Sequence, residues 1–334
     1  MAIAPITVCY TITGFPQKDI DAIAELLPDV ELIFGLTPAD FSEVKNSGKD
    51  LAVIMFGAQS HDILKDLCDD YANEKRRVKF IYSLSAGVDA YRLLELKQEV
   101  EGIPIHNGQS LYSNILAEHV NFAMMYFNRF SWRLNEAKHQ KKFEKFNMIP
   151  VEGKKVLIYG YGDIGSQCGR LAVGLGMDVT GVRRTVKDPV DQYGVKVVSD
   201  GDALLGEADF VVGVLPGTEA TKQFFNMSLF KRMKPSAVFI NIGRGSTQCE
   251  TDIAEALNTG VIRAAALDVF EVEPLPESSP LWDLPDDKML LSPHCADFTE
   301  DMLKAPVLRF KSIFNDYSTT GRTDAYRVSV EKGY

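Results

Sequence analysis

Three polar residues in the second half of the chain each follow an apolar run that predicts a buried strand. Arg244 lies in Asn-Ile-Gly-Arg-Gly, Glu273 precedes a proline, and His294 lies in Ser-Pro-His-Cys. A guanidinium can bind a carboxylate and polarise a ketone, an imidazolium can protonate the ketone oxygen, and a carboxylate can orient that imidazole and raise its pKa. Taken singly, each has a plainer role, as a helix cap, a solvated loop acid or a buried core imidazole. As a set, they supply what reduction of a 2-keto acid by hydride requires.

A glycine-rich turn lies between a predicted strand and a predicted helix. Residues 155–159 are strand-forming, and Gly-Tyr-Gly-Asp-Ile-Gly follows at 160–165, before a helical pattern of apolar residues. In such a turn Gly160 permits the sharp bend, Gly162 leaves room for a pyrophosphate, and Gly165 allows the helix to pack closely on the strand. The first helical amides then face the phosphates, at the positive end of the helix dipole. Glycine-rich turns also occur in ordinary loops, but the flanking strand and helix favour a dinucleotide site here.

The end of the next predicted strand indicates which dinucleotide is bound. Proteins that bind NAD usually have an acidic residue there, which holds the ribose 2′-hydroxyl. This chain has Arg183, 18 residues beyond Gly165, and Arg184, Thr185 and Lys187 follow. Guanidinium groups bind a 2′-phosphate through charge-assisted hydrogen bonds, whereas a carboxylate repels it. The sequence therefore predicts NADP(H) in preference to NAD(H), and the alternative is a solvated basic loop.

Strands and helices alternate along both halves of the chain. Strands are expected at residues 6–10, 51–56, 78–83, 155–159, 178–182, 210–215, 237–241, 264–268 and 289–291, and helices at 61–74 and 113–129 and after the glycine turn. This alternation predicts an α/β protein with two doubly wound parallel-sheet domains, Rossmann-like or flavodoxin-like, that have helices on both faces. The loop at 85–89 follows a strand's carboxyl end, so its amides either hold a carboxylate or form an ordinary turn. Residues 129–155 are expected to wrap onto the second domain or onto a partner subunit.

Composition and charge argue against several classes of protein. The chain has 334 residues, of which 46% are apolar and 25% charged, with a formal net charge of −10. That acidity disfavours nucleic acid or an anionic membrane as the main partner. No apolar run reaches about 18 residues, and the start of the chain has no signal-peptide pattern. Five widely spaced cysteines without a Cys-x-x-Cys pair disfavour disulfides and a zinc site, and they fit a reducing cytosol.

A series of short motifs occurs in a fixed order from about Phe80 to about Phe314. They are Ser-Ala-Gly-Val-Asp at 85–89, Ala-Glu-His at 117–119, the glycine turn with Leu-Gly-Met at 175–177, Leu-Pro-x-Thr-x-x-Thr at 215–221, Asn-x-x-Arg-Gly at 241–245, Ala-Leu-Asp-Val-Phe at 266–270 with Glu-Pro at 273–274, Ser-Pro-Leu-Trp at 279–282, and Pro-His at 293–294. With these motifs the chain resembles the D-isomer-specific 2-hydroxyacid dehydrogenases, and within them the NADPH-dependent glyoxylate/hydroxypyruvate reductases.

The resemblance implies a role for each motif. Arg244 would bind substrate, His294 would be the acid/base, and Glu273 would be its partner. Ala86 and Gly87 would donate backbone N–H groups to the substrate carboxylate. The implied cofactor contacts are Gly160, Gly162, Asp163, Ile164 and Gly165 at the pyrophosphate, Arg183, Arg184 and Thr185 at the 2′-phosphate, Leu215, Pro216, Thr221 and Ile242 along the cofactor, and Asp268, Arg244 and His294 around the nicotinamide.

The resemblance also implies an organisation. A discontinuous substrate-binding domain of residues 1–112 and 296–334 would join a dinucleotide-binding domain of residues 113–295, with a closing cleft between them. A homodimer would form through the dinucleotide-binding domain, and no metal is implied. Asp297 departs from the family, which more often has a small or aromatic residue there. An acid at this position either favours a substrate with a cation or hydroxyl group, or simply faces solvent.

Two other functions use the same fold. A formate- or phosphite-type dehydrogenase is expected to reduce NAD to NADH, and Arg183 disfavours that cofactor. A coenzyme-sensing corepressor retains the catalytic residues but typically carries long disordered tails, of which the sequence gives no sign. We therefore expect a cytoplasmic, NADPH-dependent reductase that converts glyoxylate, hydroxypyruvate or a similar small 2-keto acid to the D-2-hydroxy acid.

Overall fold

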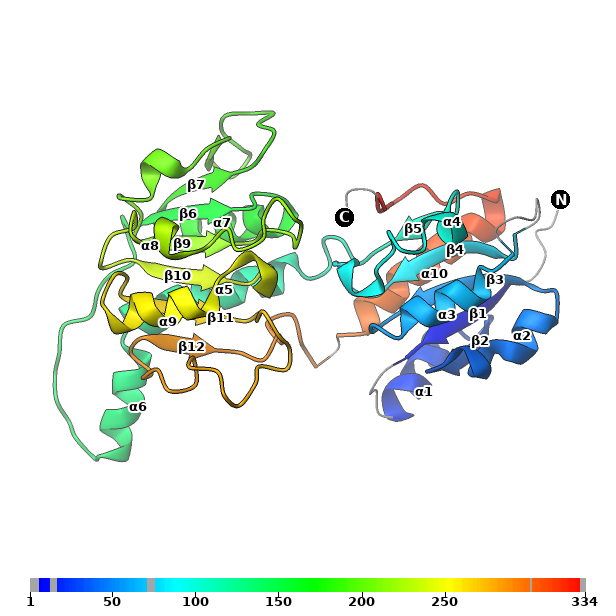
Figure 1. Cartoon of the computed structure of the whole chain (residues 1–334), viewed down its shortest axis with the longest axis horizontal. Coiled ribbons are helices and arrows are strands. Elements are labelled where there is room, and N and C mark those ends of the chain that lie inside the picture. Colours follow the sequence, from blue (N-terminus) through cyan, green and yellow to red (C-terminus); the bar gives the residue numbers. More distant parts are fainter. Residues whose placement is uncertain (1–5, 13–16, 71–75, 301, 331–334) are drawn as a thin grey trace. The chain divides into compact units, whose positions relative to one another are not determined.

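The computed structural model describes residues 6–12, 17–70, 76–300 and 302–330, and the chain divides into two compact units (Figure 1). One unit contains Met1–Leu111 and Thr299–Tyr334, and the other contains Tyr112–Phe298. Each unit has a sheet whose strand pairs are all parallel, with helices on both faces. The prediction of two doubly wound α/β units is therefore confirmed.

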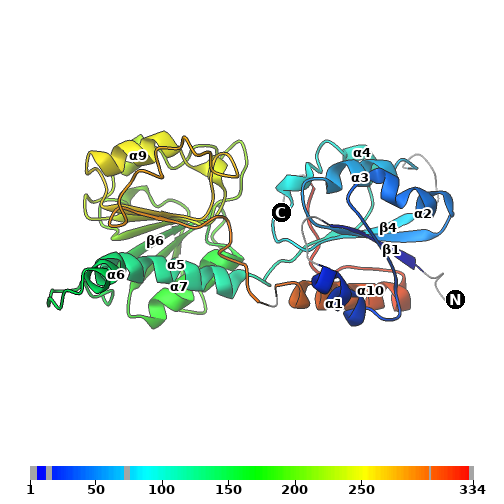
Figure 2. The ribbon, with the colours of Figure 1, turned by 90° about the horizontal axis from the view of Figure 1, so that it is seen from below.

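The first unit has a five-stranded sheet among the described residues, in the order β2-β1-β3-β4-β5. Its strands are β1 (Ile6–Thr11), β2 (Glu31–Gly35), β3 (Asp50–Met55), β4 (Val78–Ser83) and β5 (Ile105–His106). Its helices are α1 (Gln17–Leu26), α2 (Ser42–Asn46), α3 (Ser60–Leu67), α4 (Lys97–Val100) and α10 (Lys304–Thr320). Figure 2 shows α3 and α4 on one face of this sheet and α1 and α10 on the other. Strand β1 is buried at every position, as expected for a parallel strand that is covered twice.

Aromatic packing joins α10, from the end of the chain, to strands from its beginning. The ring centroid of Phe310 lies 5.9 Å from that of Phe80 and 5.8 Å from that of Tyr82. All three side chains are fully buried. The first unit is therefore built from two distant parts of the chain around one core.

The second unit has a seven-stranded sheet, in the order β12-β11-β10-β9-β6-β7-β8 within the described part of the chain. Its strands are β6 (Lys155–Tyr159), β7 (Asp178–Val182), β8 (Lys196–Val198), β9 (Phe210–Gly213), β10 (Val238–Asn241), β11 (Ala264–Leu267) and β12 (Met289–Leu291). Its helices are α5 (Ser113–Asn128), α6 (Ser131–His139), α7 (Asp163–Gly174), α8 (Met227–Phe230) and α9 (Glu250–Asn258). The strand order reverses between β6 and β9, and ligands bind outside the carboxyl ends of strands at such a point.

One predicted helix is shorter in the structure, and the predicted connector contains a helix that was not expected. The helix expected at 61–74 ends at Leu67, and residues 71–74 of that prediction lie outside the described residues. The chain turns after Cys68 because Asp70 accepts hydrogen bonds from the backbone nitrogen and Nε of Arg77, at 3.0 and 3.2 Å. The connector 129–155 contains α6, and the remaining residues 140–154, which we call the arm, form a long excursion before β6 (Figure 1). None of the described helices is long and apolar enough to cross a membrane.

Candidate active site

The glycine turn has the shape of a phosphate cradle. Gly160 has φ +91°, and a Cβ there would lie 2.3 Å from the carbonyl oxygen of Val214. A Cβ on Gly165 would lie 2.5 Å from the carbonyl oxygen of Gly160, so both positions require glycine. A Cβ on Gly162 would meet nothing within 4 Å, which leaves open space beside the first amides of α7. These observations fit a bound pyrophosphate.

Asp163 and Ile164 open helix α7, directly after this cradle. The Asp163 carboxylate accepts a hydrogen bond from the hydroxyl of Ser113, the first residue of α5. That bond links the start of the cofactor helix to the start of the neighbouring helix. No role for Ser113 was predicted from the sequence.

The basic residues after β7 are exposed. The backbone nitrogen of Arg183 donates to the carbonyl oxygen of Val198 at 3.0 Å, which continues the pairing with β8. The side chains of Arg183, Arg184 and Thr185 reach solvent. Within the described residues, no hydrogen bond or ion pair holds either guanidinium. Both charges are therefore available to an anion.

Four further residues expected along the cofactor follow β9 and β10, at the same edge of the sheet as the glycine turn. Leu215 and Pro216 follow β9, and the hydroxyl oxygen of Thr221 accepts a hydrogen bond from the backbone nitrogen of Thr218 at 3.0 Å. Ile242 follows β10 and is buried. Their position at this edge results from the parallel arrangement of the strands.

His294 and Glu273 form a hydrogen-bonded pair. Nδ1 of His294 lies 2.7 Å from Oε2 of Glu273, and the backbone nitrogen of Phe270 donates to Oε1 of Glu273 at 2.9 Å. The hydrogen bond to Glu273 raises the pKa of His294 above its usual value, although burial acts in the opposite direction. Burial raises the pKa of Glu273, but the hydrogen bonds from His294 and Phe270 outweigh it and lower that pKa overall. The imidazolium form therefore persists to higher pH than in a solvated histidine.

Asp268 holds the loop that carries His294. Its side chain is 2% exposed, and Oδ1 accepts hydrogen bonds from the hydroxyl of Ser292 at 2.6 Å and the backbone nitrogen of Cys295 at 3.0 Å. Oδ2 accepts from the backbone nitrogen of Ala296 at 3.2 Å. His294 itself has φ +50°, a conformation that non-glycine residues rarely adopt without such support.

Two contributors to this network were missed by the sequence argument. Ser292 bridges Asp268 to Nε2 of His119, which lies 3.2 Å from the Ser292 hydroxyl. Burial lowers the pKa of His119 and favours its neutral form. The available signal was the Ala-Glu-His motif on α5, but the contact of His119 with Ser292, the residue after β12, depends on the tertiary fold.

Arg244 lies in a turn fixed by buried amides. Asn241 accepts a hydrogen bond from the backbone nitrogen of Gly243 at 2.9 Å and donates one to the side chain of Gln248 at 2.8 Å. Gln248 in turn donates to the carbonyl oxygen of Val269 at 2.9 Å. Nη1 of Arg244 donates to the carbonyl oxygen of Gly243 at 2.8 Å. The positive charge of Arg244 lowers the pKa of both His294 and Glu273, so the three groups share one electrostatic environment.

The loop with Ala86 and Gly87 belongs to the first unit. Asn107 donates to the carbonyl oxygen of Ala86 at 2.6 Å, and Gly108 donates to that of Ser85 at 3.0 Å. Across the described chain, the amides of Ala86 and Gly87 have no hydrogen-bond acceptor. The loop is thus held through the carbonyls of Ser85 and Ala86 and through the Ser85 amide, which donates to Ser83 Oγ at 3.1 Å. The amides of Ala86 and Gly87 remain available within the described residues.

Asp297 lies three residues beyond His294 and is partly buried. Burial raises the pKa of its carboxyl group, while the positive charges of His294 and Arg244 lower it by smaller amounts. The structure therefore places an additional acid in the electrostatic environment of the pair.

An acid–base pair and an arginine beside a dinucleotide cradle are typical of nicotinamide-dependent oxidoreductases. Comparison with known proteins makes this class more specific. Residues 121–296 match the family model described as the D-isomer specific 2-hydroxyacid dehydrogenase, NAD binding domain. An uncharacterized protein in the proB 3′ region of Corynebacterium melassecola is 31% identical over 271 residues, which cover 79% of this chain and 86% of that protein.

Two further similarities carry functional descriptions. A probable 2-ketogluconate reductase from Dictyostelium discoideum is 41% identical over 152 residues, a match that spans only 45% of each chain. The crystal structure of an NADPH-dependent glyoxylate/hydroxypyruvate reductase from Sinorhizobium meliloti, in complex with NADP and sulfate, superposes with a TM-score of 0.80 at 27% identity. That superposition covers 98% of this chain and 100% of the other. The chain belongs to the D-isomer-specific 2-hydroxyacid dehydrogenase family.

Proposed function

We propose that the protein reduces a small 2-keto acid, such as glyoxylate or hydroxypyruvate, to the D-2-hydroxy acid with NADPH. The observation that carries the proposal is the 2.7 Å hydrogen bond between His294 and Glu273. His294 follows β12, and Arg244 follows β10, which is separated from β12 by one strand of the sheet. This pair stores a proton near neutral pH at the edge of the sheet where the dinucleotide cradle lies. The similarity to an NADPH-dependent glyoxylate/hydroxypyruvate reductase supports the same reaction.

In the proposed mechanism each side chain has one task. Arg244 binds the substrate carboxylate and polarises the carbonyl group. For the amides of Ala86 and Gly87, in the first unit, we propose the role of carboxylate donors that the family resemblance implies. Reduced nicotinamide, when bound, supplies the hydride to the carbonyl carbon. His294 gives its proton to the carbonyl oxygen, so the ketone gains one hydride and one proton and becomes the hydroxyl group. Glu273 stabilises the imidazolium before transfer and orients the neutral ring afterwards.

The cofactor preference rests on charge at the end of β7. Among the described residues, no hydrogen bond or ion pair holds the guanidinium groups of Arg183 and Arg184. Arg183 stands where an NAD-binding protein usually has an acidic residue. Such groups favour a 2′-phosphate over a 2′-hydroxyl. We assign dinucleotide binding to the second unit and substrate binding to the first, with Asp268 at the nicotinamide. We also propose a cytosolic location, because five widely spaced cysteines without a Cys-x-x-Cys pair fit a reducing compartment.

A substrate panel tests the proposal. Purified protein is mixed with NADPH or NADH and with glyoxylate, hydroxypyruvate, pyruvate or a bulkier 2-keto acid, and loss of the reduced cofactor's absorbance is followed. We expect the highest kcat/KM with NADPH and either glyoxylate or hydroxypyruvate. Turnover of formate or phosphite with NAD would support the formate/phosphite-type alternative. Tight NADPH binding without turnover of any acid would support the corepressor-type alternative.

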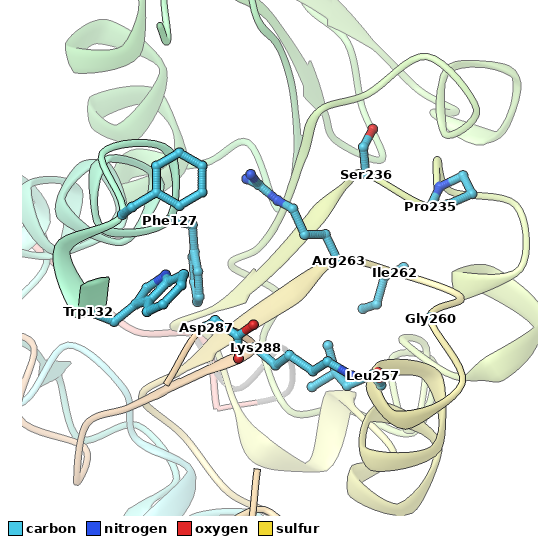
Figure 3. A pocket seen from close by; sticks show the side chains of 11 residues that line it. Phe127, Trp132, Pro235, Ser236, Leu257, Gly260, Ile262, Arg263, Asp287 and Lys288 are labelled. Atoms are coloured by element: carbon cyan, nitrogen blue, oxygen red, sulfur yellow. Dashed lines mark hydrogen bonds between the residues drawn. The ribbon is translucent and has the colours of Figure 1, made fainter. Parts of the chain in front are cut away.

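We also propose a homodimer formed by the second unit, on the basis of a pocket of about 580 Å³ at the amino ends of β10, β11 and β12. The pocket is lined by Phe127, Phe130, Trp132, Pro235, Ser236, Leu257, Gly260, Ile262, Arg263, Asp287 and Lys288. Figure 3 shows Phe127 and Trp132 on one side and Arg263 and Ile262 on the other. It lies at the opposite ends of the strands from Arg244 and His294, so it is separate from the catalytic site. Arg263 contributes a buried Nε without a hydrogen-bond partner among the described residues.

The arm of a second copy is the proposed occupant. Phe143, in the arm, is 96% exposed, although aromatic side chains usually find an apolar contact. Its neighbours Lys141, Lys142 and Lys145 complement the exposed carboxylates of Asp286 and Asp287 beside the pocket. If the arm of each copy lay in the pocket of the other, the same two surfaces would be in contact twice. This is the two-fold symmetric arrangement that most homodimers have.

Sedimentation analysis of Phe143→Ser tests this arrangement. An aromatic anchor typically contributes at least about 2 kcal/mol to an interface, so the dimer dissociation constant should rise at least about thirtyfold. Leu94→Ser, which alters an exposed leucine of the first unit, is the matched control. A variant and control with the same dissociation constant would exclude the arm from the interface.

A further inference from the structure

The loop between β7 and β8 carries the basic residues at one end and is anchored to the glycine turn at the other. Tyr161, the second residue of that turn, is 2% exposed, and its hydroxyl donates a hydrogen bond to Oδ2 of Asp191 at 2.7 Å. Burial raises the pKa of Tyr161, and the carboxylate raises it further, so the hydroxyl remains protonated and able to donate. A single side chain thus connects the phosphate cradle to the loop that begins at Arg183.

The tyrosine ring occupies a space provided by two glycines. A Cβ on Gly181, in β7, would lie 2.1 Å from the Tyr161 ring, and a Cβ on Gly169, in α7, would lie 2.8 Å from its hydroxyl. The ring therefore packs directly against the backbone of both elements. Any movement of the hydroxyl relative to β7 and α7 is restricted by this packing.

Asp191 organises the far end of the loop. Its Oδ1 accepts hydrogen bonds from the backbone nitrogens of Tyr193 at 2.8 Å and Val195 at 3.0 Å. Its own backbone nitrogen donates to the carbonyl oxygen of Val195 at 3.0 Å. The Tyr193 hydroxyl accepts from Nε2 of Gln167, in α7, at 3.1 Å. The loop is thus closed on itself at Asp191 and attached to the body of the unit at two points.

We propose that Tyr161 is a positioning residue for recognition of the 2′-phosphate, acting through Asp191 on the loop that carries Arg183 and Arg184. The inference rests on the proposed NADPH preference and adds to it. The two guanidinium groups are exposed and have no partners among the described residues, so binding must order their side chains. With the backbone of the loop already held by the Tyr161–Asp191 bond, only those side chains remain to be ordered when the phosphate arrives.

The test is Tyr161→Phe, which keeps the ring and removes only the hydroxyl. Calorimetric titration uses 2′-phospho-ADP-ribose and ADP-ribose, two probes that lack the nicotinamide and therefore report no chemistry. We expect the Kd for 2′-phospho-ADP-ribose to rise about tenfold, the scale of one lost hydrogen bond to a charged group, and the Kd for ADP-ribose to change by less than about twofold. The kcat at saturating NADPH should stay close to that of the wild type while the KM for NADPH rises.

Tyr159→Phe is the matched control. Tyr159 lies in β6 of the same unit, and its buried hydroxyl has no hydrogen-bond partner among the described residues. The same deletion there should leave the ratio of the two Kd values unchanged. Hydrogen exchange without nucleotide provides a second measurement, in which residues 183–195 should exchange faster in Tyr161→Phe but not in Tyr159→Phe.

The outcomes separate this inference from the cofactor preference. A wild type that binds both probes equally overturns the NADPH preference and the positioning role with it. A wild type that prefers the phosphate, with a Tyr161→Phe variant that keeps the full preference, overturns the positioning role alone. An equal loss of affinity for both probes in Tyr161→Phe also overturns it, because the hydroxyl would then support the adenosine site in general.

Discussion

The two basic regions of the second unit are held in opposite ways. Arg244 lies in a turn fixed by buried Asn241 and Gln248, next to a hydrogen-bonded His294–Glu273 pair. Arg183 and Arg184 extend from a strand end into solvent. In the described part of the chain, the backbone nitrogen of Arg183 is bonded to Val198 and the far end of the loop is held through the Asp191 side chain. The region proposed for catalysis is thus already held by hydrogen bonds. The region proposed for the 2′-phosphate would be completed only when the phosphate orders the arginine side chains.

The difference follows from what each region has to do. Proton transfer needs its groups in place when the transition state forms, and a small displacement lowers the rate strongly. A phosphate that only anchors the cofactor tolerates several side-chain arrangements, because the attraction between full charges has little directional preference. In the proposed mechanism, rigid support therefore lies at the proton donor, and exposed charge lies where the cofactor would be anchored.

Removal of the proton donor should have the largest effect. His294→Ala is expected to lower kcat for 2-keto acid reduction by about 10²–10⁴-fold, the usual contribution of a general acid. Steady-state kinetics with saturating NADPH measure this effect. Binding of ADP-ribose should be retained, which would show that the cradle is intact. Near-wild-type turnover would remove His294 from the proposed mechanism.

Loss of the Arg244 guanidinium should have the second-largest effect on catalysis. Arg244→Ala is expected to lower kcat/KM by about 10²-fold, since two charge-assisted hydrogen bonds to the carboxylate and ketone disappear. Both kcat and KM should worsen, because Arg244 acts in the ground state and in the transition state. Arg232→Ala, at an exposed surface ion pair with Asp202, is the matched control and should change kcat/KM by less than about twofold.

The exposed region is tested by reversing its charge. Arg183→Asp combined with Arg184→Gln should lower the ratio of kcat/KM for NADPH to that for NADH by about tenfold or more. The kcat at saturating cofactor should change little, because the proposed contact is with the 2′-phosphate, at the opposite end of the cofactor from the reacting nicotinamide. A wild-type enzyme that works equally well or better with NADH would contradict the proposed role of both arginines.

The smallest expected effect is a shift in the pH dependence that the His294–Glu273 pair gives to the reaction. Glu273 raises the pKa of His294, so wild-type reduction should decline only as pH rises through that raised pKa. In Glu273→Gln the charge is lost, and the decline should begin about one pH unit lower. The reverse reaction needs neutral imidazole, so its rising limb should move in the same direction. Profiles of kcat/KM against pH in both directions measure the shift, and identical profiles would mean that Glu273 does not control the proton.

Much of the fold was predictable because its signals are local. The apolar runs of β4, β7 and β12 gave their bounds correctly, since each strand is flanked by turn residues. The helix after Ser60 was overestimated because its end depends on Arg77, a residue on the far side of the turn. The short strand β8 was not expected, because its three residues form a strand only by pairing with β7.

The sequence by itself predicted the family, through the ordered motifs that include the glycine turn and the three polar strand ends. It also led to the proposed NADPH preference, through the arginine pair after β7. These features could be predicted because each of them depends on residue types and on their spacing over a short stretch of sequence. The tertiary structure alone decided how those groups are supported, through the links from His119 to Ser292 and Asp268 and from Tyr161 to Asp191. Such links join residues far apart in the chain, and their partners become neighbours only when parallel strands align their carboxyl ends.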